Sequence, residues 1–199
     1  MKQTWLISDT HFGHEKTCTV FKRADGSPLR PFSCAEEMDE FMVKAWNERV
    51  KPNDKVYHLG DVAIRKQSLQ LLHRLNGDKV LIKGNHDIFE LKDYAEHFRD
   101  IRGYHVLNGM IMSHVPVHED SLARFGTCIH GHLHANRVRK PVSVTREGKT
   151  TYVDEIDPRY HNVSVEMIDF APISFDEVQD RIKDEGGMIG FKETSAVFM

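Results

Sequence analysis

Five short segments of the chain end in side chains of the kinds that bind metal ions. These segments are Asp9-Thr10-His11, Gly60-Asp61, Gly84-Asn85-His86-Asp87, Ser113-His114 and Gly131-His132-Leu133-His134. Carboxylate, amide and imidazole ligands together suit divalent ions of intermediate softness, namely manganese, iron, cobalt, nickel or zinc. None of the three cysteines falls in these segments, which argues against a structural zinc site. The segments therefore indicate a catalytic site that holds divalent metal.

The number of candidate ligands indicates two ions. A single catalytic ion takes about four to six ligands and keeps one position open. The chain offers more than that, which is about right for two ions that share a carboxylate. Paired ions about 3.5–4 Å apart are a common arrangement for in-line displacement at phosphorus. The candidate ligands are Asp9, His11, Asp61, Asn85, His114, His132 and His134.

Each of these segments directly follows a short apolar run that is typical of a buried strand. Ligands of open α/β sheets bind beyond the carboxyl ends of the strands. We therefore expect the five segments to meet at one rim of the fold. The predicted strands that precede them cover residues 4–7, 55–59, 79–82, 110–112 and 127–129.

Helical patterns separate the early strands, which predicts a βαβ arrangement. One helix over residues 38–46 should begin at a capping box of Ser33 and Glu36. A second is expected over residues 66–75, ended by Gly77. After Met110 the predicted strands follow one another, with further strands at 150–153 and 163–168, before a final helix capped by Ser174. The apolar stripe of the first helix comprises Met38, Phe41, Met42, Ala45 and Trp46.

Composition predicts a globular protein of one domain spanning residues 1–199. Apolar residues make up 40% and charged residues 29% of the 199 positions. The formal net charge of −3 argues against stable binding to duplex DNA. No apolar run approaches the roughly 18 residues of a membrane span, so we expect no membrane association. Three cysteines without a C-x-x-C spacing favour a reducing, cytoplasmic location.

Two segments stand apart from this pattern. Residues 17–32 form an insertion with several cations, which is either a solvated surface loop or a loop that borders the site. Arg23 and Arg30 of this loop, together with His14, are candidate contacts to a substrate. Residues 188–199 are expected to form a mobile tail.

The order of the motifs D-x-H, G-D, G-N-H-D, H and G-H-x-H resembles that of the calcineurin-like metallophosphoesterase superfamily. The match runs from Asp9 to His134, and the strings DTHFGH, RPF, VYHLGDV and NVSVE are similar to small bacterial and phage members. The resemblance implies an α/β fold built as a four-layer α/β/β/α sandwich with mixed sheets. The appearance of consecutive strands after Met110 agrees with a second sheet.

The resemblance also implies a role for each motif residue. His86 would contact the phosphate and protonate the leaving oxygen, and Asp87 would orient His86 by a hydrogen bond. Asp61 would bridge two ions, with manganese as the first expectation. The remaining ligands would divide into Asp9, His11 and His134 for one ion, and Asn85, His114 and His132 for the other.

The expected activity is hydrolysis of phosphodiesters, such as small or cyclic nucleotides, by a hydroxide that bridges the two ions. Two divalent ions, two carboxylates and this hydroxide leave a formal charge of roughly +1, which a diester monoanion neutralises. The loop cations Lys22, Arg23 and Arg30 would shift the preference towards monoesters, so a phosphomonoesterase or nucleotidase is the alternative. A metal-binding scaffold without catalysis is a third reading, which the presence of His86 disfavours.

Overall fold

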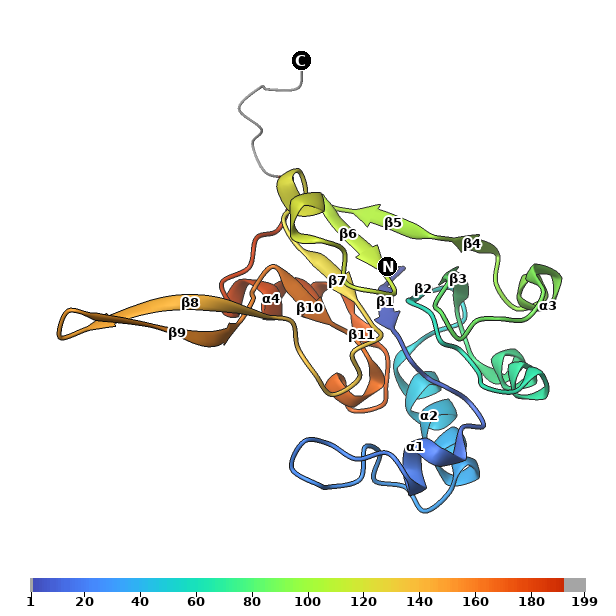
Figure 1. Ribbon diagram of the computed structural model, residues 1–199. Coiled ribbons are helices and arrows are strands. Elements are labelled where there is room, and N and C mark those ends of the chain that lie inside the picture. Colours follow the sequence, from blue (N-terminus) through green and yellow to red (C-terminus); the bar gives the residue numbers. More distant parts are fainter. Residues whose placement is uncertain (1, 192–199) are drawn as a thin grey trace.

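The computed structural model describes residues 2–191 and arranges them around two β-sheets (Figure 1). The strands β1 to β4 of the first sheet run parallel, and β11 pairs antiparallel with β1. The parallel strands predicted before the first three motifs are therefore confirmed. In spatial order this sheet comprises β11 (Ile173–Ser174), β1 (Thr4–Ile7), β2 (Lys55–His58), β3 (Asp78–Ile82) and β4 (Asp100–Arg102).

The second sheet contains the strands that precede the last two motifs. Strands β10, β7 and β6 are parallel, while β5 is antiparallel to β6. The predicted α/β class with a second sheet is confirmed by this arrangement, although that sheet already begins with β5, which precedes Met110 and was not predicted. In spatial order the sheet comprises β10 (Tyr160–Asn162), β7 (Cys128–His130), β6 (Met110–Ser113) and β5 (Tyr104–Leu107).

The two sheets meet at Ser8, directly after β1. The Ser8 N–H donates to the Val163 carbonyl at 3.0 Å, and the Val165 N–H donates to the Ser8 carbonyl at 3.1 Å. This pairing takes the chain out of the second sheet after Asn162. The strand predicted over 163–168 is consequently wrong, because Val165–Met167 forms a single 3₁₀ turn here.

The helices begin and end close to the predicted positions. The final helix is capped as expected, with the Glu177 N–H donating to the Ser174 hydroxyl at 3.1 Å. The capping box predicted from Ser33 and Glu36 is absent, because Ser33 donates to Glu37 and Cys34 is the N-cap residue. The predicted helix over 66–75 is a 3₁₀ helix at Lys66–Arg74. The α-helices are α1 (Glu15–Thr19), α2 (Ala35–Arg49), α3 (Leu91–Ala95) and α4 (Phe175–Asp184), and a further 3₁₀ segment covers Glu119–Ala123.

Helix α2 buries most, but not all, of its predicted apolar stripe. Met38, Met42 and Trp46 are buried in the main core. Phe41 was expected beside them, yet its side chain is 46% exposed and its ring lies 5.3 Å from that of Phe32. The buried face is rotated relative to the predicted stripe, because Asp39 and Val43 are buried in place of Phe41.

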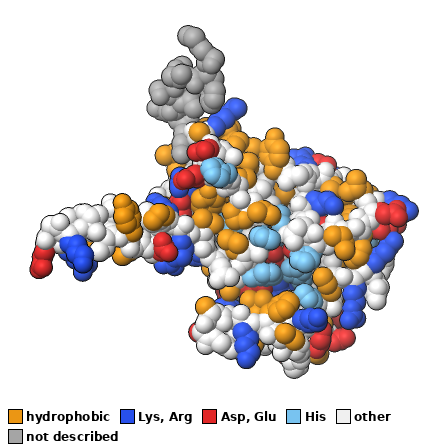
Figure 2. All heavy atoms as spheres, viewed as in Figure 1, with side chains coloured by type: hydrophobic (Ala, Val, Ile, Leu, Met, Phe, Trp, Pro, Cys, Tyr) orange, Lys and Arg blue, Asp and Glu red, His pale blue; other side chains and the backbone are white. Residues whose placement is uncertain are grey.

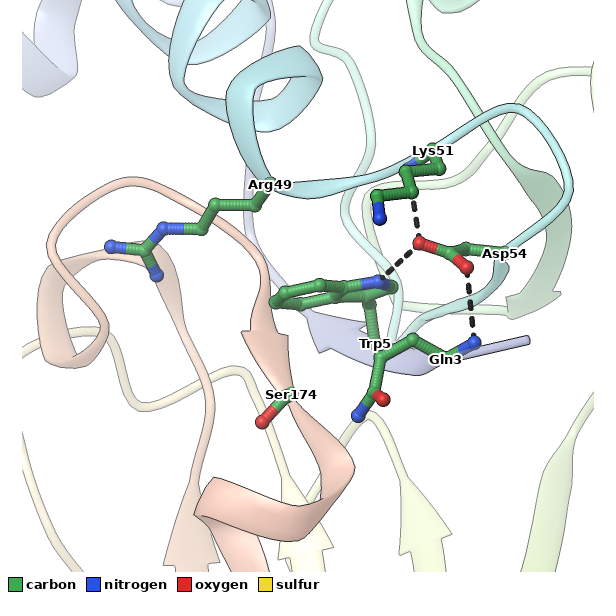
Figure 3. Close-up of a pocket in the computed structure, with 6 residues that line it drawn as sticks. All are labelled: Gln3, Trp5, Arg49, Lys51, Asp54 and Ser174. Atoms are coloured by element: carbon green, nitrogen blue, oxygen red, sulfur yellow. Dashed lines mark hydrogen bonds between the residues drawn. The ribbon is translucent and has the colours of Figure 1, made fainter. Parts of the chain in front are cut away.

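The amino ends of the parallel strands are closed by Asp54 (Figure 3). Its carboxylate accepts hydrogen bonds from the Gln3 N–H, the Lys51 N–H and the Trp5 indole, all at 3.0 Å. A hollow of about 430 Å³ lies here, with Arg49 also lining it. Because the Asp54 oxygens are all used in joining β1 to the turn before β2, this end of the sheet has a structural role.

The remaining chain forms a hairpin and a C-terminal segment. Strands β8 (Arg139–Arg146) and β9 (Lys149–Ile156) pair only with each other among the described residues and project from the body (Figure 1). Residues 188–191 are held, since the Thr127 hydroxyl donates to the Met188 carbonyl at 2.8 Å. The rest of the tail predicted over 188–199 lies outside the described residues. Within 2–191, no helix is long and apolar enough to cross a membrane.

Replacing Trp46 with alanine should destabilise the protein by about 3–5 kcal/mol, because a large cavity opens in the core. The change also leaves the Asn76 carbonyl without the indole N–H that donates to it at 2.9 Å. Chemical denaturation measures the loss. Phe41→Ala on the same helix is the matched control, and an equal loss in both variants would contradict this assignment of the buried face.

Candidate metal centre

The turns after five strands bring the motif residues to one place. β1 leads into Asp9 and His11, β2 into Asp61, and β3 into Asn85. The second sheet adds His114 after β6, and His132 with His134 after β7. Histidine side chains gather near the middle of the face shown in Figure 2. The carboxyl ends of strands from both sheets therefore meet, as the sequence pattern predicted.

The side chains form two groups that could each hold a metal ion. Asp9, His11 and His134 make one group, in which all ligand atoms lie within 4.8 Å of one another. Asp61, His114 and His132 make the second group, to the same limit. Below, they are called the first cluster and the second cluster. The first cluster is the set that the sequence resemblance implied for one ion, whereas the second contains Asp61 where the resemblance gave Asn85 beside His114 and His132.

Asp61 lies between the two clusters. Its Oδ2 atom is 3.4 Å from His114 Nε2 in the second cluster and 3.5 Å from His11 Nε2 in the first. Its Oδ1 atom accepts the backbone N–H of His86 at 2.8 Å, which fixes the orientation of the carboxylate. One oxygen of Asp61 is thus held by the chain, and the other faces ligand atoms of both clusters.

Most of the candidate ligands have an uncommon backbone conformation. A positive φ is rare for residues with a side chain and marks positions that the surrounding structure must stabilise. Here it allows a chain leaving a strand to turn sharply and point consecutive polar side chains at one centre. The ligands concerned are Asp9 (φ 59°), His11 (48°), Asp61 (58°), His132 (68°) and His134 (49°).

The first cluster leaves buried polar atoms that no described residue satisfies. Asp9 Oδ2 accepts the His132 N–H at 2.9 Å and the Ser164 hydroxyl at 2.8 Å. Among residues 2–191, however, Asp9 Oδ1 and both ring nitrogens of His11 have no hydrogen-bond partner although they are buried. Unpaired buried polar atoms are costly. A bound cation would satisfy Asp9 Oδ1 and one ring nitrogen of His11, so the donor set fits a divalent metal.

The electrostatics of Asp61 also suit a metal ligand. Burial alone would raise its pKa, but the hydrogen bond from His114 and the charge of His114, with lesser contributions from His11 and the His86 N–H, lower that pKa to about 2. The carboxylate is therefore ionised at neutral pH. An ionised carboxylate is the form that coordinates a cation.

Asn85 and His86 follow Gly84 at the end of β3 and lie on the exposed side of the centre. The Asn85 Oδ1 atom is 2.9 Å from His114 Nε2, which places Asn85 at the second cluster. The His86 ring is exposed and lies edge-on to His11, with a centroid distance of 5.4 Å. A Cβ atom on Gly84 would collide with Asp61 Oδ1, so only glycine fits before this pair.

Asp87 does not orient His86, which corrects the role implied by the resemblance. No hydrogen bond joins these two side chains in the part of the chain that the structure describes. The buried Asp87 carboxylate instead accepts backbone N–H groups from Asp61 at 2.9 Å, Val62 at 2.9 Å and Gly84 at 2.8 Å. Asp87 thus positions the turn that carries Asp61 and acts on the metal centre indirectly.

Arg30 is a second correction, because it is fully buried and cannot contact a substrate. Its Nε atom donates to Glu166 at 2.8 Å, and its other nitrogens donate to the carbonyls of Asp9 and Thr10 at 2.5 and 2.8 Å. Glu166 Oε1 in turn lies 3.1 Å from His134 Nδ1. Arg30 therefore supports the turn after β1 and the orientation of His134.

Glu166 and Ser164 were not among the predicted site residues. Both belong to the string NVSVE, residues 162–166, which is similar to small bacterial and phage members of the superfamily. A carboxylate that accepts the second ring nitrogen of a metal-binding histidine fixes its tautomer and orientation. The string NVSVE was therefore a sequence signal for Ser164 and Glu166. Because a strand was predicted over 163–168, the turn that positions these two side chains was not foreseen.

His14 lies beside the centre, whereas Arg23 lines a hollow that contains none of the candidate ligands. The His14 ring is 5.5 Å from that of His11 and borders a hollow of about 430 Å³ that Lys16 and Arg65 also line. Arg23 lines a separate hollow of about 260 Å³ shared with Ala135, the residue after His134. The loop over 17–32 reaches the site through Phe21, whose ring centroid is 5.6 Å from that of His14, and α1 occupies the first residues of the loop.

Asp61→Asn should weaken metal binding at both clusters, because a neutral amide replaces the one carboxylate that faces both. Elemental analysis of the purified variant after incubation with manganese gives the stoichiometry. Asp120→Asn, at an exposed position away from the centre, is the matched control. Full metal occupancy of both clusters in the Asp61 variant would show that Asp61 is not a ligand shared by them.

Comparison with known proteins places the chain in a family. The model of the calcineurin-like phosphoesterases matches residues 2–177. An uncharacterized protein of Methanocaldococcus jannaschii is 37% identical over 180 residues, covering 88% of this chain and 89% of that protein. The gene 66 protein of Mycobacterium phage L5 is 36% identical over 93 residues, 44% of this chain and 41% of its own. A crystal structure of the Aquifex aeolicus protein AQ665, of unknown function, shares the fold with a TM-score of 0.60 at 22% identity, covering 91% of this chain and all of that one. The chain belongs to the calcineurin-like phosphoesterase family and is a metal-dependent hydrolase of phosphoric esters.

Proposed function

We propose that this phosphoesterase hydrolyses phosphodiester bonds of small or cyclic nucleotides with two divalent ions. The observation that carries the proposal is the position of Asp61 Oδ2, within 3.5 Å of a ring nitrogen from each cluster. The mixture of oxygen and imidazole ligands favours manganese, with iron, zinc, cobalt and nickel as alternatives.

In this proposal each ion is held by residues of one cluster, and Asp61 contacts both. Asp9, His11 and His134 hold the first ion, while Asn85 joins His114 and His132 at the second. Two ions bound in this way lower the pKa of water to about 7 and polarise the phosphoryl oxygens. The protein supplies the fixed geometry: Glu166 orients His134, and Asp87 holds the turn of Asp61.

His86 is the proposed proton donor to the leaving oxygen. Its exposed ring stands at the edge of the centre, whereas its backbone N–H is anchored on Asp61. The side chain is therefore held close to the reacting phosphate and still reaches a substrate that arrives from solvent. Proton transfer from a positioned side chain contributes typically about 10²–10⁴-fold to a rate.

The choice of ester is tested with two chromogenic substrates of the same leaving group. With manganese present, kcat/KM for bis-p-nitrophenyl phosphate should exceed that for p-nitrophenyl phosphate. Cyclic nucleotides and nucleoside monophosphates then extend the comparison to biological esters. A preference for the monoester in both pairs would overturn the assignment to phosphodiesters.

His86→Ala should keep both ions and lose about 10²–10⁴-fold in kcat on esters with a poor leaving group. Esters of p-nitrophenol, which leave without a proton, should be affected much less. Metal content by elemental analysis separates loss of the acid from loss of the centre. Wild-type turnover of an alkyl ester by this variant would show that His86 is not the proton donor.

A phosphomonoesterase or nucleotidase is the second candidate, because free cations border the centre. Lys16 and Arg65 line the hollow next to His14, and neither forms an ion pair with any residue from 2 to 191. A monoester dianion carries one charge more than a diester. The hollow offers positive charge that would stabilise that additional charge.

Arg65→Ala measures this contribution. If monoesters are the substrates, KM for nucleoside monophosphates should rise about five-fold, the effect of losing a partly solvated charge contact. KM for bis-p-nitrophenyl phosphate should hardly change. Arg146→Ala, in the remote turn of the hairpin, is the control for a lost surface charge. Equal effects on both ester classes would exclude a role for Arg65 in recognising the second charge.

A further inference from the structure

The hairpin of β8 and β9, residues 139–156, is here called the arm. Among residues 2–191, no other strand pairs with it. Every residue of β9 is exposed, and the arm projects from the body in Figures 1 and 2. The base of the arm is held by two ion pairs of Arg159. Its guanidinium lies 2.6 Å from the buried Asp157 carboxylate and 2.9 Å from the Glu119 carboxylate. Since an isolated two-stranded ribbon is only marginally stable, such an anchored but uncovered arm calls for a partner.

One edge of the arm has open backbone groups. The turn at Glu147 (φ 52°) and Gly148 (φ 76°) has the type I′ signs, which make Arg146 and Lys149 a hydrogen-bonded pair. Hydrogen-bonded and non-hydrogen-bonded residue pairs then alternate along the ladder. Pro141, which has no N–H, falls opposite Asp154 at a non-bonded pair, consistent with this phase.

It follows that the backbone groups of Thr150, Tyr152 and Asp154 point away from β8. The Asp154 carbonyl accepts the Arg139 guanidinium at 2.7 Å, and a carbonyl oxygen can accept a second bond. β9 therefore presents an unpaired strand edge, the kind of surface on which another strand adds.

The side chains of β9 are arranged symmetrically about Tyr152, which is 76% exposed. Lys149 stands three residues before it and Glu155 three residues after it. Neither forms an ion pair within residues 2–191. Lys149 faces the like charge of Arg146 across the ladder, and Glu155 faces Lys140 without reaching ion-pair distance. Like charges directly opposite each other destabilise a sheet, whereas opposite charges stabilise it.

We propose that β9 pairs antiparallel with β9 of a second copy of this chain, about a two-fold axis at Tyr152. In this register Lys149 lies opposite Glu155 of the other copy, twice, and Tyr152 lies opposite its own counterpart. The outward backbone groups of Thr150 meet those of Asp154 in the other copy. The two arms then form one four-stranded sheet, and the interface is isologous.

The charges of the arm favour this register over shifted ones, and a second copy of the chain over a nucleic acid. A shift by two residues would bring Lys149 opposite Val153 or beyond the end of β9, and the ionic pairs would be lost. A nucleic acid is a poorer partner, because Glu147, Asp154 and Glu155 offset the cations of the arm. Binding of a nucleic acid with no dimer formed is accordingly one of the outcomes that would overturn the proposal.

Sedimentation equilibrium of the metal-loaded, full-length protein across the micromolar range tests the proposal. The wild type should form dimers in a concentration-dependent way. Lys149→Glu and Glu155→Lys should each raise the dissociation constant at least about ten-fold, since each places like charges opposite one another. The double exchange should restore dimer formation, because it reverses both charges at once.

A second pair of variants tests the strand edge itself. Tyr152→Pro removes an outward N–H of β9 and should abolish the dimer, while Ser143→Pro makes the same change on the outer edge of β8 and should leave it intact. Circular dichroism checks that both variants fold. The proposal is wrong if the wild type stays monomeric throughout, if the charge variants associate like the wild type, or if the two proline variants behave alike.

Discussion

The Asp61 carboxylate connects the two clusters, and the surrounding chain is organised to hold it there. One of its oxygens accepts the His86 N–H, and the other faces histidines from both sheets. A carboxylate at such a point must be buried, ionised and fixed in direction. Burial opposes ionisation, so the hydrogen bond and charge of His114, together with the His86 N–H, are needed to keep the pKa low. The pair of clusters therefore depends on one electrostatic balance at the end of β2.

The metal centre requires unfavourable backbone conformations, and groups outside it stabilise them. Five ligands have a left-handed backbone conformation, which costs of order 1–3 kcal/mol at each residue. Asp87 accepts three N–H groups from the turns after β2 and β3, and Arg30 binds the carbonyls after β1. These two buried charges stabilise the turns whose backbone would otherwise be strained and unpaired. Their complete burial agrees with such a supporting role.

The motif residues of the centre were predictable because each follows a strand, and parallel strands bring their carboxyl ends together. The roles of Asp87 and Arg30 were not, because sequence spacing reports proximity along the chain and not which group a buried charge faces. Asp87 is adjacent to His86 in sequence, yet its side chain points back to Asp61 and Val62. Phe41 fits the helical period, but which side of α2 is covered depends on neighbouring elements. The arm was predicted only in part, since residues 139–146 carry a proline and several cations within a strand.

Anomalous diffraction from crystals grown with manganese tests the central claim most directly. We predict two manganese peaks about 3.5–4 Å apart, one beside Asp9, His11 and His134 and the other beside Asn85, His114 and His132, with an Asp61 oxygen bound to both. A single peak, or two peaks of which only one contacts Asp61, would contradict the account of a shared carboxylate.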